Sequence, residues 1–351
     1  PVLLHGNRFD AYVQDYWRAT RNLTVSLGLR YDIFGAYQED KNRLINFDFK
    51  NGVQILPQST ASIVQSIIDP LPPAFQFRPD GQVLPHTQFH NFAPRIGFAY
   101  SLRERIVLRA AYGIFYGVNI ANGASNEGTV PPFRIQGGPS ADLNNPLRIS
   151  DGFAGPTGTL QAPNLSGFYR PLNDSDPYSQ KWNTDAQLGI SRTTFLDVGY
   201  TGAHTIHSYV TSLGNVPLPG PGPIQPRRPF PNVGTVSEWL PIGSNTYNGL
   251  EISFRQLNFH GLSGQSAFTY SRSYGLNSGA DEGSVTNPFN YSYDYGPTGF
   301  DTPIQWVSTL NYKIPVPGNS SGFVNEILGG WETSAVVTRQ SGFPFTVGLS
   351  T

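Results

Sequence analysis

The chain has 351 residues, a net charge of −1 and a pI near 6.7, so it has no broad basic surface of the kind that binds nucleic acid. Charged residues make up only 13%, whereas Gly (38) and Pro (30) are abundant, a composition that favours many strands joined by irregular loops. The absence of Cys excludes disulfide bonds and thiolate metal sites, and the sequence contains no apolar run of about 18 residues that could form a transmembrane helix.

A hairpin opens the chain. Apolar and polar residues alternate over 23–33, and this period of two predicts a strand with one apolar face and one polar face. A partner strand is predicted over 10–17, across a tight connection at 18–22. The polar face carries Arg30 and Asp32, which would pack poorly in a dry core. The strand length matches the roughly 9–11 residues that a tilted strand needs to cross a bilayer.

The same pattern recurs along the rest of the chain. The further predicted strands are 95–101 with 106–116, 181–191 with 195–202, and 247–257 with 262–271, followed by 304–314 and 331–340. About ten strands result, and tight turns alternate with segments of roughly 30 to 60 residues, an asymmetry typical of outer-membrane barrels. We therefore predict an all-β, antiparallel transmembrane barrel with short periplasmic turns and long extracellular loops. Alternation alone would also fit a soluble sandwich or propeller.

The long loops carry weaker signals. The apolar run at 62–68 predicts one or two helical turns, and YSYDYG at 291–296 predicts a loop strand that extends the barrel wall. The proline-rich segment 216–232 predicts extended polyproline geometry, in which Arg227 and Arg228 serve solubility. Aromatic residues of the loops are candidates for substrate capture: Phe133, Phe168, Tyr169, Phe230, Trp239, Tyr291, Tyr293 and Tyr295.

Two sets of strand residues are candidates for function. Six charged residues lie mid-strand on the predicted polar faces: Arg30, Arg109, Asp185, Asp197, Glu251 and Arg255. In a barrel they would face the lumen and line the substrate path or hold a plug, although ion pairing between neighbouring strands is the more ordinary role. Aromatic residues near strand ends are candidates for interfacial girdles or for packing against neighbours: Trp17, Tyr31, Tyr100, Tyr116, Tyr200, Tyr270, Tyr312 and Trp331.

Catalytic motifs are missing from the sequence. It contains no GxSxG, HExxH or phosphate-binding glycine loop, so we expect neither an enzyme nor a bound cofactor. The pairs His86/His90 and His204/His207 have helical metal-ligand spacing, but they lie in or beside predicted loops without a carboxylate at ligand spacing. We therefore expect no metal site.

Several strand segments resemble one known family. AYVQDYWRATRNLTVSLGLRYDIF (11–34) resembles a barrel hairpin of TonB-dependent outer-membrane receptors, and NFAPRIGFAYSLRERIVLRAAYGIFYG (91–117) resembles the next hairpin of their Oar-like branch, abundant in Acidobacteria. PYSQKWNTDAQLGISRTTFLDVGYTGAH, YNGLEISFRQ and GGWETSAVVTRQSGFPFTV continue in the same order. The resemblance implies a 22-stranded barrel closed by a plug, in the outer membrane of a Gram-negative bacterium, and energised through the TonB–ExbB–ExbD system.

The chain departs from that family pattern. No plug, TonB-contacting box or carboxypeptidase-regulatory-like domain precedes Pro1, so we expect residues 1–351 to form part of a barrel domain of a longer protein. The expected function is a receptor that binds an unknown extracellular substrate at its loops and imports it. The expected partners are outer-membrane lipid and TonB–ExbB–ExbD, reached through the missing N-terminal part, and not nucleic acid. The alternatives are a passive barrel or surface adhesion protein, and a soluble β-rich secreted binding domain.

Overall fold

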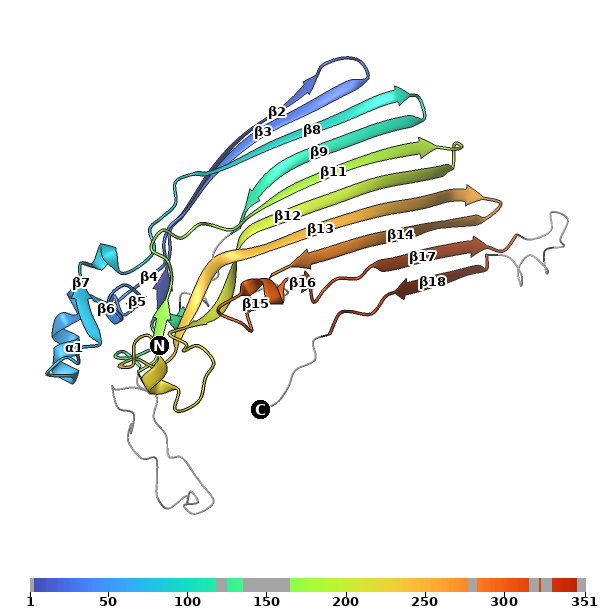
Figure 1. The fold of residues 1–351 in the computed structure, drawn as a ribbon. Coiled ribbons are helices and arrows are strands. Elements are labelled where there is room, and N and C mark those ends of the chain that lie inside the picture. The colour runs from blue at the N-terminus through green and yellow to red at the C-terminus, as the bar shows by residue number, and fades with distance from the viewer. Residues whose placement is uncertain are drawn as a thin grey trace.

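The computed structural model describes residues 3–117, 125–134, 165–276, 283–315, 322 and 330–345. Its main feature is one antiparallel sheet in which ten strands follow each other in chain order, so that each strand pairs with its neighbours in sequence (Figure 1). The strands are β2 (Arg8–Arg18), β3 (Leu23–Phe34), β8 (Asn91–Arg103), β9 (Ile106–Tyr116), β11 (Tyr178–Gly189), β12 (Thr194–Gly214), β13 (Val236–Phe259), β14 (Leu262–Gly275), β17 (Ile304–Lys313) and β18 (Glu332–Gln340).

These strands confirm all of the predicted ones. Several of them are longer than predicted, and β12 and β13 exceed their predicted ranges most. These two strands continue past the region of regular alternation and remain paired up to Gly214 opposite Val236. Register shifts between Ile206 and Val210 mark this extension, as β-bulges do where a strand bends. Figure 1 shows the four tight turns at one end of the sheet and the connections that follow β3, β9, β12 and β14 at the other.

The turn between β13 and β14 shows how the sequence sets the hairpins. His260 and Gly261 both have positive φ, 52° and 88°, as the two central residues of a type I′ turn require. A Cβ added to Gly261 would lie 2.6 Å from the carbonyl oxygen of Lys313, so the close approach of the next strand also requires glycine.

The ten-strand sheet is a single layer over most of its length. Leu27 is 47% exposed, Leu108 38% and Leu250 41%, and all three lie on the apolar face. These side chains do not pack into a dry interior, as they would in a soluble sandwich or barrel. An apolar face that is left open along ten strands is the arrangement expected for contact with lipid.

At the end opposite the tight turns, several connections pack into a second structure, which we call the loop body (residues 36–90, 125–134, 165–177 and 215–235). It contains β5 (Asn46–Asp48), β6 (Val53–Pro57), β7 (Phe75–Arg78), α1 (Ala61–Ile67), β10 (Gly167–Tyr169) and the 3-10 helices η1 (Gln58–Thr60), η2 (Asp80–Gln82) and η4 (Gln225–Arg227). Its dry core consists of Ile45, Phe47, Leu56, Val64, Ala74, Phe75, Leu165, Val233 and Val236. The parallel pairing of β10 with the start of β13 joins this core to the sheet.

Short elements complete the described part. They are β1 (Leu4–His5), β4 (Gln38–Glu39), β15 (Gly283–Ser284), β16 (Gly296–Pro297) and the 3-10 helix η5 (Tyr291–Asp294). No helix among the described residues is both long and apolar enough to cross a membrane.

The structure corrects two of the loop predictions and confirms one. The helical turns predicted at 62–68 are confirmed by α1. The predicted strand at YSYDYG is wrong, because the side chain of Asn290 accepts a hydrogen bond from the amide of Ser292 and caps a 3-10 helix instead. The proline-rich segment is not uniformly extended, since it contains η4.

The two arginines of the proline-rich segment do more than keep it soluble. Arg228 donates to the carbonyl oxygen of Asn215 (2.6 Å) and to the hydroxyl of Thr235 (3.0 Å). Arg227 donates to the carbonyl oxygen of Leu218 at 2.9 Å. Both side chains therefore satisfy polar groups of an irregular backbone that has few ladder hydrogen bonds of its own.

Candidate functional site

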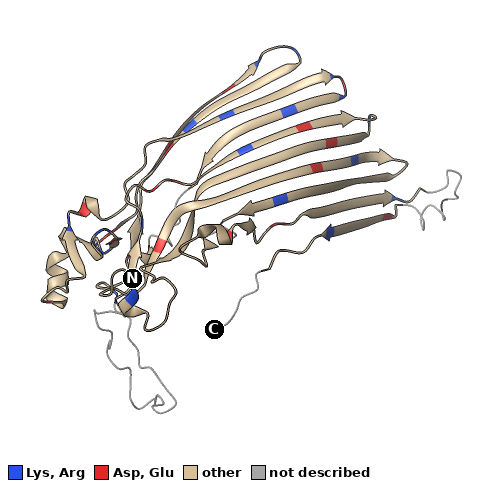
Figure 2. Ribbon diagram, viewed as in Figure 1, with Lys and Arg blue, Asp and Glu red and all other residues tan. Residues whose placement is uncertain are grey.

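The six charged strand residues share one face of the sheet. The register places Arg109 opposite Asp185, Asp185 opposite Gly199, and Gly199 opposite Glu251, and residues that face each other across a ladder point to the same side. By the same rule Arg30, Asp197 and Arg255 lie on this side, which we call the polar face. Figure 2 shows the charged residues as bands spread over successive strands.

Among the six charged strand residues, Arg109 and Asp185 form an ion pair with each other across two neighbouring strands. Nη1 of Arg109 lies 3.0 Å from Oδ2 of Asp185, and Nη2 donates to Gln187 at 3.0 Å. Arg30 contacts Asp32 at 2.8 Å and Asp10 of the neighbouring strand at 3.4 Å. These contacts match the ordinary role of cross-strand charges.

The other members of the set are used differently. The guanidinium carbon of Arg255 lies 5.2 Å from the ring centre of Phe195, directly opposite on β12. Asp197 and Glu251 form no ion pair with any described residue. The polar face therefore keeps unpaired carboxylates on β12 and β13, available to water or to another surface.

The separation of charge between the faces has exceptions. Arg272 of β14 lies opposite Asn248, on the side of Leu250 and Tyr270, and each of the two outermost strands carries one more. Asp15 of β2 lies opposite Leu27, and Arg339 of β18 lies opposite Trp306, so both fall on the apolar side. Both strands are fully exposed and each pairs with only one other described strand.

The candidate girdle aromatics lie mostly on the apolar face. Trp17 and Tyr100 are opposite Val25 and Leu23, near the tight turns, and Tyr312 is opposite Leu262 at the same end. Tyr31, which is opposite Phe92, lies near the loop body, and so does Tyr116 at the end of β9. Tyr270 is opposite Ile304, and Trp331 directly precedes β18.

Tyr200 is placed differently from the prediction. It was expected near a strand end, but β12 continues to Gly214, so Tyr200 lies inside a longer strand. In the ladder it shares a row with Tyr270 through Leu250. Its hydroxyl donates to the side chain of Asn248 at 2.5 Å.

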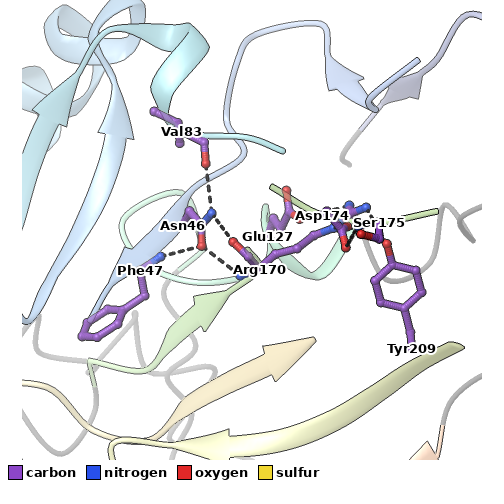
Figure 3. A network of polar contacts seen from close by, with 8 residues as sticks. All are labelled: Asn46, Phe47, Val83, Glu127, Arg170, Asp174, Ser175 and Tyr209. Carbon is purple, nitrogen blue, oxygen red and sulfur yellow. Dashed lines mark hydrogen bonds and ion pairs between the residues drawn. The ribbon is translucent and has the colours of Figure 1, made fainter. Parts of the chain in front are cut away.

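A buried polar network lies where the loop body meets the sheet (Figure 3). Nε of Arg170 donates to Asp174 at 2.6 Å, and the hydroxyl of Tyr209 on β12 donates to the same carboxylate oxygen at 2.5 Å. The guanidinium also lies 4.8 Å from the ring centre of Trp239, which stacks on Tyr209. Asp174 and Arg170 are 4% and 6% exposed.

Asn46 connects this network to the small sheet of the loop body. Its side-chain nitrogen donates to the carbonyl oxygens of Arg170 (2.8 Å) and Val83 (3.0 Å). Its side-chain oxygen accepts from the amides of Arg170 and Phe47, both at 2.9 Å. One buried amide thus satisfies the backbone of three segments, which is how irregular chain can be buried without unpaired polar groups.

Glu127 is the least satisfied member of the network. It is 2% exposed, and its carboxylate lies 3.6 Å from Arg170, within ion-pair range but beyond hydrogen-bond length. Burial raises the pKa of Glu127 to about 7. Burial also raises the pKa of Asp176, which accepts a hydrogen bond from Asn91 at 2.7 Å.

No local sequence pattern predicts this network, because its partners are far apart in the chain. Arg170 meets Asn46 across 124 positions and Tyr209 across 39. Two of the aromatic residues predicted for substrate capture also belong here. That prediction is wrong for Phe168 and Trp239, which are 5% and 1% exposed and form a core cluster with Tyr209.

The other aromatic candidates differ in exposure. Phe133, Tyr169 and Phe230 pack against the core of the loop body. Tyr293 and Tyr295 are 74% and 53% exposed, so they remain available for contact with a ligand.

The histidines of the two predicted pairs make different local contacts. His86 lies 3.2 Å from the carbonyl oxygen of Gly81, whereas His204 contacts the hydroxyl of Thr246 at 2.9 Å within the ladder of β12 and β13. No group of three or more His, Asp or Glu side chains within reach of one metal ion occurs among the described residues.

Comparison with known proteins assigns the family. Residues 2–351 match the family model described as an outer membrane beta barrel domain, so the chain belongs to that family. It is therefore a β-barrel protein of the outer membrane of a Gram-negative bacterium. The predicted fold class and the predicted localisation are both confirmed. No curated protein matches the chain.

Several solved structures match the chain at low identity. The FrpB iron transporter from Neisseria meningitidis (F3-3 variant) has 11% identity and a TM-score of 0.46, over 90% of this chain and 31% of that one. The outer membrane transporter YddB from Escherichia coli has 13% identity and a TM-score of 0.49, over 95% and 37%. The ferric enterobactin receptor PfeA (mutant G324V) from Pseudomonas aeruginosa has 12% identity and a TM-score of 0.45, over 88% and 30%. The chain thus spans about a third of the length of these structures.

Proposed function

We propose that the chain forms part of the barrel wall and the outer loops of a TonB-dependent receptor of the Oar-like type. In this proposal the loops bind an extracellular substrate, which then enters along the polar face without covalent chemistry. The energy comes from TonB–ExbB–ExbD, which acts through a part of the protein outside residues 1–351.

The observation that carries the proposal is the position of the loop body. It has its own dry core and a buried ionic network, and it is fixed to the extensions of β12 and β13 by Tyr209 and Trp239. A preorganised structure at the loop end of the sheet, beside the polar face, suits ligand capture, since little ordering is needed on binding. The resemblance of segments such as 11–34 and 91–117 to TonB-dependent receptors supports the energy-coupled form of the proposal.

Uptake measurements in the native bacterium test this proposal. The gene is deleted, and depletion of organic solutes from a defined medium is followed by mass spectrometry, with and without a proton ionophore. We expect particular solutes to remain in the medium both after deletion and in ionophore-treated wild-type cells. Deletion-sensitive uptake that ignores the ionophore would instead indicate a passive barrel. Unchanged uptake together with lost attachment to surfaces would indicate an adhesion protein.

A further inference from the structure

A small cavity lies between the end of the first hairpin and the loop body. It has a volume of about 160 Å³, and its charged lining consists of Arg8, His86, Arg170, Asp174 and Asp176. Protein cavities of about 150 Å³ hold a benzene-sized molecule, so this one has room for a ligand of about six non-hydrogen atoms.

The charges on the buried side of this cavity already neutralise each other. Both oxygens of Asp174 are engaged, one by Arg170 and Tyr209 and the other by the amide of Ser175 at 3.0 Å. The buried Arg170–Asp174 pair therefore shapes the cavity without leaving a net charge for a ligand.

One wall carries a cation without an anionic partner. Arg8 is the first residue of β2, and its guanidinium carbon lies 4.7 Å from the ring centre of Phe34, its neighbour on β3. Stacking of this kind fixes the plane of the guanidinium and leaves its N–H groups free to bind an oxyanion. Arg8 forms no ion pair with any residue that the structure describes.

Another wall carries a carboxylate without a cationic partner. Oδ2 of Asp176 accepts from the side chain of Asn91, which lies opposite Asp32 at the end of the ladder between β3 and β8. No described Lys, Arg or His lies within ion-pair distance of Asp176. A half-buried carboxylate in this state favours a cationic ligand, because burial without a counter-charge is unfavourable.

We propose that this cavity binds a small zwitterion of the amino-acid class, with its carboxylate on Arg8 and its ammonium group on Asp176. An anion alone would leave Asp176 without a counter-charge, and a cation alone would make no use of the stacked guanidinium of Arg8. Alanine, with six non-hydrogen atoms, has both charges and the right size. This inference rests on the proposed function in one respect, since it names the ligand class that the outer loops take up.

Titration calorimetry on the full chain in detergent micelles tests the inference. Alanine is compared with lactate, which has a hydroxyl in place of the ammonium group, and with alanine amide, which lacks the carboxylate. We expect alanine to bind, and the loss of either charge to weaken binding by about tenfold or more, as charge-assisted hydrogen bonds predict. Equal binding of all three compounds, or no binding of alanine, would overturn the inference.

Matched variants locate the site. Arg8→Gln and Asp176→Asn should each raise the Kd for alanine by about tenfold or more, whereas Arg8→Lys should restore part of the affinity. Arg18→Gln, at the other end of β2, and Asp15→Asn, on its apolar side, are controls that should leave the Kd unchanged. Circular dichroism confirms that each variant keeps its β structure. Wild-type Kd values in both site variants would place alanine elsewhere and reject the assignment.

The outcomes separate this inference from the proposed function. Alanine binding that depends on Arg8 and Asp176, in cells whose uptake is unaffected by gene deletion, would keep the site and reject the transporter. Uptake that needs the gene and the proton gradient, without alanine binding, would keep the transporter and reject the site.

Discussion

The ten-strand sheet and the loop body are held together in different ways, although one chain forms both. The sheet is a single layer whose apolar side chains remain open, as Leu250 shows at 41% exposure. The loop body buries Ile45, Leu56 and Val233 completely, as a soluble domain does. The sheet therefore depends on lipid to cover its apolar face, whereas the loop body gains its stability by removing side chains from water.

Ion pairs show the same contrast. Arg109 and Asp185 of the sheet are 44% and 28% exposed, and water can solvate either partner alone. The side chains of Arg170 and Asp174 in the loop body are only 7% and 5% exposed, so each depends on the other for compensation of its charge. Similar distances, 3.0 Å and 2.6 Å, therefore carry different energetic weight.

Arg170→Met should give the largest effect. It leaves the carboxylates of Asp174 and Glu127 buried without a cation, which we expect to destabilise the loop body by about 3–5 kcal/mol. Thermal unfolding in detergent, followed by limited proteolysis between residues 165 and 177, measures the loss. A change below about 1 kcal/mol would show that water reaches the network. The ion pairs of the loop body would then be solvated like those of the sheet.

Leu250→Arg tests which face of the sheet meets lipid. A charge on the lipid face near the midplane should cost roughly 2–4 kcal/mol. The control is Glu251→Arg, one position along the same strand and on the polar face, which should have a much smaller effect. Urea-dependent folding into phospholipid vesicles measures both. Equal costs for the two variants would mean that both faces meet the same medium.

Glu127→Gln tests the burial of the loop body through pH. Because the folded pKa of Glu127 is raised to about 7, the folded state keeps a proton that the unfolded state releases above its ordinary value near 4.5. Stability therefore falls as the pH rises from about 4.5 to 7, by roughly 3 kcal/mol for this group.

The Gln variant should lose that part of the pH dependence and be more stable than wild type at pH 8. A smaller dependence should remain from Asp176, whose pKa is raised in the same direction. Melting temperatures of both proteins between pH 4.5 and 8 measure the difference. Parallel curves would show that Glu127 titrates normally.

Arg109→Met should give the smallest effect. Its ion pair with Asp185 is largely solvated, and exposed pairs of this kind contribute about 0.2–1 kcal/mol. The urea titration used for Leu250 detects this difference. A loss as large as that of Arg170→Met would indicate that the polar face is covered by other protein and dry.

The sheet could be predicted from the sequence because its physical signal is local. Alternation over 23–33 or 106–116 requires only neighbouring residues, and the side-chain period of two follows directly from strand geometry. Alternation also identified the shared face of Arg109, Asp185 and Glu251. It failed where β12 passes Ile206, since bulges interrupt the period there.

The loop body could not be predicted because its signal is not local. Trp239 lies in a segment that was predicted to be a loop, which made it resemble an exposed loop aromatic, yet it stacks on Tyr209 and beneath Arg170. Asn46 has no periodic context at all, and its role depends on segments more than a hundred positions away. Cavities such as the one beside Arg8 form only when these distant segments meet.

The composition of the loop body also constrains how the protein is assembled in its membrane. Its parts come from three separate connections, those after β3, β9 and β12, which all emerge on the side opposite the tight turns. None of them can complete the shared core alone, because Phe47, Leu165 and Val233 must come together from different hairpins. The complete core can therefore form only after the last of these segments has reached the outer side of the membrane.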